Sequence, residues 1–159
     1  TSGGESVTMK KQIERSALVW YSAQEMFELV NDVRSYPEFL PWCASAEIHE
    51  ESAEHLMASL EVAKSGVRQS FTTRNWLEHP RRIGIELVDG PFTRLRGEWV
   101  FQPLDERACK VMLSLEFALQ GRVARLAFGN VFSQAANNMV DAFCQRAEHV
   151  YSEKEVGGR

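Results

Sequence analysis

Histidines and cysteines are the side chains of this chain best suited to binding a metal. The histidines have no metal-ligand spacing to one another or to a cysteine. The cysteines form an odd, sparse set without a CxxC pair, which is typical of buried free thiols rather than of a disulfide framework. We therefore predict no metal centre. The residues concerned are His49, His55, His79, His149, Cys43, Cys109 and Cys144.

A run of glutamates could hold a catalytic acid–base pair. It consists of Glu47, Glu50, Glu51 and Glu54, and such a run is more often a solvated turn than an active site. The chain has no nucleophile elbow, phosphate-binding loop or dinucleotide fingerprint. A cyclase- or dehydratase-like enzyme would need a buried acid or base in a cavity, and the sequence nominates none. We expect a protein that binds its ligand without chemistry and requires no cofactor.

Aromatic residues exceed what a thin core needs, and as a group they can line an apolar cavity. Flat rings and Met139 suit a flat, apolar ligand, through stacking and dispersion. Thr73 and Asn75 share one strand face with Phe71, so they could hydrogen-bond a ligand carbonyl or only each other. Ordinary core packing is the alternative for each aromatic residue. The aromatic residues considered are Trp42, Phe71, Trp76, Trp99, Phe101, Phe117, Phe128, Phe132 and Phe143.

The predicted ligand-binding set combines these aromatic and polar residues with apolar residues of the same strand faces. It comprises Trp42, Phe71, Thr73, Asn75, Leu87, Trp99, Phe101, Leu113, Phe128, Phe132 and Met139.

Arginines are predicted on the opposite, wet face of the strands, where they could form a basic patch. Such a patch can dock on RNA phosphates or on anionic lipid heads. The arginines are Arg68, Arg74, Arg94 and Arg96. The alternative is a solvated mixed-charge surface, because glutamates are predicted on the same face and the whole chain carries a formal charge of -4.

The bulk composition indicates one domain. A chain of 159 residues with 44% hydrophobic content is long enough to bury a core. We predict a domain over residues 8–152, with flexible ends at 1–7 and 153–159. No signal peptide or apolar run of ~18 residues is visible, so we expect a cytoplasmic location, with any membrane contact peripheral and at the inner membrane.

Alternating apolar and polar residues predict a strand meander with one buried face. A short amphipathic helix, capped at Ser22 and ending near Arg34, separates the first strand from the rest. A final helix of about 30 residues spans ~45 Å, which is enough to cover the sheet. The predicted strands are 10–20, 44–51, 54–64, 67–77, 82–88, 92–102 and 109–117, and the long helix is 122–151.

This order of elements is the α+β helix-grip arrangement, and the residues also resemble a known family. The chain is similar to the START-like domains of the polyketide cyclase and coenzyme-Q-binding group. The matching segments are RSALV (15–19), LVNDV (29–33), SYP (35–37), FLP (39–41), FTTRN (71–75), LVDGPF (87–92), LAFG (126–129), VF (131–132), ANNMV (136–140) and AF (142–143).

The resemblance implies a deep apolar cavity between the sheet and the long helix. It further implies a ubiquinone-like ligand, carried or chaperoned in support of respiration. Some bacterial members are toxins that bind the large ribosomal subunit and block subunit association, which is the alternative function. We expect the mouth of the cavity between residues 36–42, the turn at 89–92 and the start of the long helix.

Overall fold

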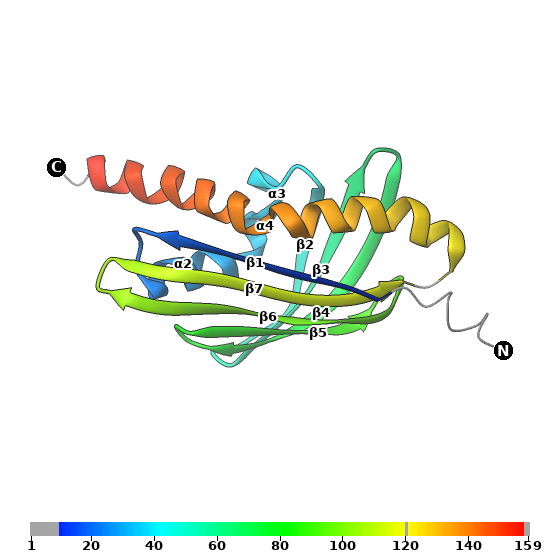
Figure 1. The fold of residues 1–159 in the computed structure, drawn as a ribbon, viewed down its shortest axis with the longest axis horizontal. Coiled ribbons are helices and arrows are strands. Elements are labelled where there is room, and N and C mark those ends of the chain that lie inside the picture. The colour runs from blue at the N-terminus through cyan, green and yellow to red at the C-terminus, as the bar shows by residue number, and fades with distance from the viewer. Residues whose placement is uncertain (1–9, 120, 158–159) are drawn as a thin grey trace.

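The computed structural model describes residues 10–119 and 121–157, with the backbone alone for 122–126 and 152–157. A long helix lies across one face of an antiparallel sheet (Figure 1). The elements are β1 (Lys10–Val19), α2 (Ala23–Asn31), the 3-10 helix η1 (Val33–Ser35), α3 (Tyr36–Phe39), β2 (Cys43–Glu51), β3 (His55–Lys64), β4 (Val67–Glu78), β5 (Arg82–Asp89), β6 (Phe92–Asp105), β7 (Ala108–Leu119) and α4 (Arg122–Gly157).

The sheet has seven strands among the described residues, in the order β1-β7-β6-β5-β4-β3-β2. Neighbouring strands are antiparallel, and sequential strands from β2 to β7 pair with each other. Successive side chains of a strand point to opposite faces. The inner face therefore collects the apolar side chains, whereas the outer face is polar. The predicted helix-grip fold is confirmed.

The helix α4 packs on the inner face through residues spaced three or four apart. Phe128, Phe132, Ala135, Phe143 and Ala147 are all buried, because residues at these intervals lie on one side of a helix. At Gly129 an added Cβ would lie 2.9 Å from the Leu119 side chain. The glycine thus lets α4 approach β7 closely, and the helix runs through it without interruption.

Polar contacts fix the position of α4 along the sheet. The Arg15 guanidinium of β1 donates two hydrogen bonds, of 2.9 and 3.2 Å, to Asn137 Oδ1 of α4. Farther along, the Tyr151 hydroxyl donates to the Glu25 carbonyl of α2 at 2.7 Å. The helix is consequently tied both to the edge strand and to the short helical region.

The segment between β1 and β2 departs from the predicted single helix. The predicted cap is present, since Ser22 and Glu25 form a reciprocal capping box. However, α2 ends at Asn31 and not near Arg34, because Asp32 leaves helical backbone geometry. The chain then continues as η1 and α3. Pro37 is tolerated in the first turn of α3, where its missing N–H would have no helical partner.

The C-terminal end also differs from the prediction. The helix α4 continues to Gly157, whereas the sequence analysis ended it at Tyr151 and expected a flexible end from 153. No glycine or proline interrupts the helix between Tyr151 and Gly157, so no strong helix-breaking residue lies there. The predicted flexible segment at 1–7 lies outside the described residues, as do residues 158–159.

Candidate functional site

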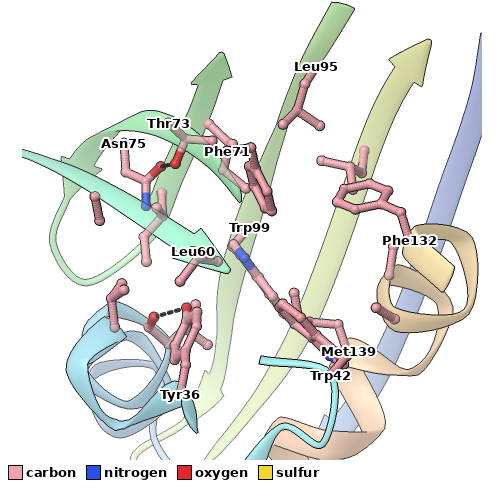
Figure 2. Close-up of a pocket in the computed structure, with 18 residues that line it drawn as sticks. Tyr36, Trp42, Leu60, Phe71, Thr73, Asn75, Leu95, Trp99, Phe132 and Met139 are labelled. Carbon is pink, nitrogen blue, oxygen red and sulfur yellow. Dashed lines mark hydrogen bonds between the residues drawn. The ribbon is translucent and has the colours of Figure 1, made fainter. Parts of the chain in front are cut away.

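An apolar cavity of about 80 Å³ lies between the inner face of the sheet and α4. Its walls come from the helical region, the strands β3 to β7 and the middle of α4 (Figure 2). The lining residues are Val30, Val33, Tyr36, Trp42, Ala58, Leu60, Phe71, Thr73, Asn75, Ile83, Ile85, Leu95, Trp99, Leu115, Phe132, Ala135, Ala136 and Met139. The structure thus places an apolar site where the fold resemblance implied one.

Most of the predicted ligand-binding residues lie around this cavity. They are Trp42, Phe71, Thr73, Asn75, Trp99, Phe132 and Met139. They come from four separate elements or connections, which the strand pairing and the packing of α4 bring together. Contact of these residues with a ligand stays a prediction.

Four predicted residues lie elsewhere. Phe101 is fully buried, stacks on Trp99 with ring centroids 6.2 Å apart and contacts the edge of Phe27. Phe128 packs against Phe92 and Phe132. Leu113 is a buried core residue, and Leu87 is half-buried at the margin of the core. Their strand or helix face was predicted correctly, but the cavity occupies only part of that face.

Trp76 does not line the cavity, although the sequence analysis grouped it with the aromatic residues that could do so. It lies on the outer face of β4 and is 47% exposed. The Arg74 guanidinium lies over its ring at 6.0 Å, and the His55 ring lies 5.7 Å away. Its position is an odd number of residues from Phe71, so the period-two alternation of β4 already placed it on the opposite face.

Tyr36 is a cavity residue that the sequence analysis missed. Its hydroxyl donates a 2.5 Å hydrogen bond to the Val30 carbonyl, which holds η1 and α3 against the end of α2. Burial raises the pKa of Tyr36 well above its usual value, and the nearby Cys43 and Asp32 add to that effect. The phenol therefore stays protonated. The sequence signal that could have identified Tyr36 is its position beside Pro37 and close to Pro41.

Thr73 and Asn75 form the polar part of the cavity wall. The Thr73 hydroxyl donates to Asn75 Oδ1 at 3.1 Å (Figure 2). The amide nitrogen of Asn75 has no hydrogen-bond partner among the residues that the structure describes, so it can donate to an acceptor on a ligand.

The turn at 89–92, one of the three segments expected around the mouth, does not line the cavity. Phe92 is only 2% exposed and belongs to a cluster of edge-to-face phenyl rings with Phe71, Phe117, Phe128 and Phe132. At Gly90 a Cβ would lie 2.6 Å from the Phe71 Cβ, so the turn packs closely against the base of the Phe71 side chain. Neither Gly90 nor Phe92 lines the cavity. Aromatic packing closes this end.

The outer face carries the predicted arginines among carboxylates. Arg68 pairs with Glu61 at 2.6 Å, and Arg94 pairs with Glu116 at 3.2 Å. Lys10 also pairs with Glu116, at 3.1 Å, and Arg96 helps to lower the pKa of that carboxyl. In the described part of the chain, Arg74 and Arg96 have no carboxylate within ion-pair distance. The surface is mixed in charge, with these two arginines the least neutralised of the four.

No group of three or more histidine, cysteine and acidic side chains in the described residues is arranged to hold a metal ion. The cysteines are free, and burial raises the pKa of Cys43 and of Cys109 to about 11, which disfavours the reactive thiolate. No helix in the described part of the chain is long and apolar enough to cross a membrane.

The fold, the helix-covered cavity and the sequence together define the class. Residues 19–144 match the family described as polyketide cyclase / dehydrase and lipid transport, and the chain belongs to this family. The Zhui aromatase/cyclase of Streptomyces sp. R1128 has the same fold, with a TM-score of 0.77 at 22% identity over 88% of this chain and 94% of that one.

Two relatives are similar to most of this chain. A Vibrio cholerae protein named ribosome association toxin RatA is 52% identical over 143 residues, which covers 90% of this chain and 99% of the relative. A Drosophila melanogaster protein named coenzyme Q-binding protein COQ10, mitochondrial, is 28% identical and covers 84% of this chain and 58% of the relative.

Proposed function

We propose that this protein associates with the ribosome. The observation that carries the proposal is the 52% identity to the Vibrio cholerae RatA protein over nearly the whole length of both chains. By the family resemblance, the partner is the large ribosomal subunit and the consequence is inhibition of subunit joining.

The outer face supplies a surface that fits RNA. The exposed Trp76 ring offers a flat face on which an unpaired base can stack. Arg74 lies beside it on β4, and Arg96 lies two strands away on β6. Glu86 of the intervening β5 is in register with both arginines but forms no ion pair with either. Arginines that are not already held by a carboxylate are free to contact phosphates. We infer that Arg74, Trp76 and Arg96 form the centre of the contact.

Sedimentation with purified ribosomal subunits tests the proposal. We expect the protein to travel with the large subunit and to dissociate as salt rises, because phosphate contacts release counterions. The double variant Arg74→Glu/Arg96→Glu should lose at least about tenfold in affinity, or ~1.4 kcal/mol. Arg107→Glu, at an exposed turn outside this surface, is the matched control and should bind normally. Absence of wild-type binding to either subunit would refute ribosome association.

A second function is supported by the cavity. We propose that the cavity binds an apolar, quinone-like ligand and that the protein does not alter the ligand chemically. Its walls are aliphatic and aromatic, with the Thr73–Asn75 pair as a hydrogen-bonding group, which is the usual composition of a small-molecule site. Tyr36, the only titratable residue among the described lining residues, is held protonated, which supports binding rather than acid–base catalysis. Such a carrier would exchange its ligand at the surface of the inner membrane.

Native mass spectrometry with lipid extraction tests this second function. Protein from a quinone-producing host should carry a quinone or a similar lipid at near-stoichiometric level, or should take up added short-chain quinone. A protein that is isolated empty and takes up none of the added quinone would refute ligand binding. That result would leave ribosome association untouched.

A further inference from the structure

A second cleft lies on the surface next to the cavity. Its volume is about 90 Å³, and it is bounded by the connection between α3 and β2, the end of β3 and the exposed side of α4. The residues that line it are Leu40, Pro41, Trp42, Lys64, Val131, Gln134, Ala135, Asn138 and Ala142.

Trp42 and Ala135 line both the cleft and the cavity. They therefore form the partition between the two spaces. The Ala135 methyl has no rotatable heavy atom, whereas the Trp42 indole turns about two side-chain torsions. Trp42 borders the cavity together with Met139 of α4 (Figure 2). Rotation of the indole is consequently the smallest movement that joins the cleft to the cavity.

The backbone on both sides of Trp42 is held in place. The Ala63 N–H donates to the Trp42 carbonyl at 2.9 Å, and the Cys43 N–H donates to the Leu40 carbonyl at 2.9 Å. Arg146 of α4 pairs with Glu38 of α3 at 3.0 Å and lies over the Phe39 ring at 4.8 Å. These contacts favour opening by the side chain alone over displacement of the whole segment.

The size of the cavity makes such an opening necessary. Sites that enclose a small molecule usually measure about 300–1,000 Å³, and the cavity measures about 80 Å³. The opposite end is closed by the phenyl cluster around Phe92. A ligand of that size does not fit in the present cavity. Continuity with the cleft adds space and leaves part of the ligand outside the present cavity.

The rim of the cleft has a distinct chemistry. Lys64, Gln134 and Asn138 are exposed there, and each carries an N–H donor. Lys64 has no ion-pair partner among the described residues. Behind the rim the walls are apolar, with Leu40, Val131 and Ala142. An amphiphile with an oxygen-bearing head and an apolar body fits this gradient from polar to apolar.

We propose that Trp42 is the gate of the cavity, and that an amphiphilic ligand enters from this cleft with its apolar part passing inward. Its head, a carbonyl or a carboxylate, stays at Lys64, Gln134 and Asn138. This inference rests on the proposed ligand-binding function and extends it by the route and by the place of the head.

Stopped-flow uptake of a short-chain quinone tests the gate. Uptake is read as quenching of tryptophan fluorescence, to which Trp99 and Trp42 in the cavity wall contribute. Ala142→Phe fills the cleft without entering the cavity, and it should slow uptake about tenfold, equivalent to ~1.4 kcal/mol of barrier. Asp141→Phe, its exposed neighbour on α4, is the control and should leave the rate unchanged. Trp42→Ala should speed both uptake and release by about the same factor.

Unchanged rates in folded Ala142→Phe and Trp42→Ala proteins would overturn the gate while leaving ligand binding intact. If Trp42→Ala fails to fold, the uptake rate of Ala142→Phe alone decides whether the gate is upheld. A wild-type protein that takes up no quinone would overturn the ligand-binding function and the route with it.

Lys64→Met tests the place of the head with two probes, the neutral quinone and an alkyl carboxylate of similar length. Weaker binding of the carboxylate alone assigns an acidic head, and weaker binding of both assigns hydrogen bonding to an oxygen acceptor. Unchanged binding of both would overturn the head site at Lys64.

Discussion

The two faces of the sheet differ in how their side chains interact, although the same strands build both. On the inner face, Phe71 and Phe132 belong to a connected group of rings that are nearly inaccessible to water. On the outer face, Arg68 and Arg94 form separate ion pairs whose members remain partly exposed. The inner contacts are therefore coupled to one another, whereas the outer contacts are largely independent and screened.

This difference separates the two proposed functions along one strand. In β4, Phe71, Thr73 and Asn75 line the cavity. Arg74 and Trp76 alternate with them along the strand and lie on the outer face. A substitution on one face leaves the other face chemically unchanged. Ligand uptake and ribosome binding should accordingly be separable by changes only one residue apart.

The largest effect is expected from Phe132→Ala. The Phe132 ring packs against Phe71, Phe92, Phe117 and Phe128, so its removal should lower the free energy of unfolding by about 3–5 kcal/mol. Urea denaturation measures this. Met139→Ala at the half-buried cavity wall is the comparison and should cost less, while still weakening ligand binding. Equal, small losses in both variants would show that the rings are not a connected core.

A smaller loss is expected from Tyr36→Phe. The change deletes the buried hydroxyl that donates to the Val30 carbonyl, which should destabilise the protein by about 1 kcal/mol. The same deletion at Tyr21, which is half-buried and whose hydroxyl has no partner among the described residues, is the matched control. A loss no greater than that of Tyr21→Phe would mean that the buried hydrogen bond does not anchor α3.

The smallest effect is expected on the outer face, at Glu116. Lys10 and Arg94 lower the pKa of this carboxyl below the usual glutamate value. Its contribution to stability is therefore complete above the unfolded-state value of about 4.3, and is lost as pH falls through the lower folded-state pKa. Glu116→Gln should reduce the fall in melting temperature between about pH 6 and about pH 3. Calorimetry at both pH values measures it.

An unchanged pH dependence in Glu116→Gln would show that the ion pairs at this carboxylate do not stabilise the fold. The outer face would then contribute to solubility and to the proposed ribosome contact, but not to the stability of the fold.

The sequence by itself determined the order of the elements and the face on which most residues lie. Period-two alternation placed Phe71 inward and Arg74 outward, and the Ser22–Glu25 spacing located the start of α2. These features depend on backbone geometry within a few residues, so they can be read locally.

Only the tertiary structure decided how deep each inward residue lies and where the cavity opens. Phe101 and Trp99 share a face of β6, yet only Trp99 reaches the cavity, because α2 packs over Phe101. The turn at 89–92 is closed by Phe71, which lies about twenty residues earlier. Trp42 and Ala135 meet at the partition although ninety-three positions separate them. Such contacts depend on how α4 lies across the sheet, and no spacing within a single element encodes that placement.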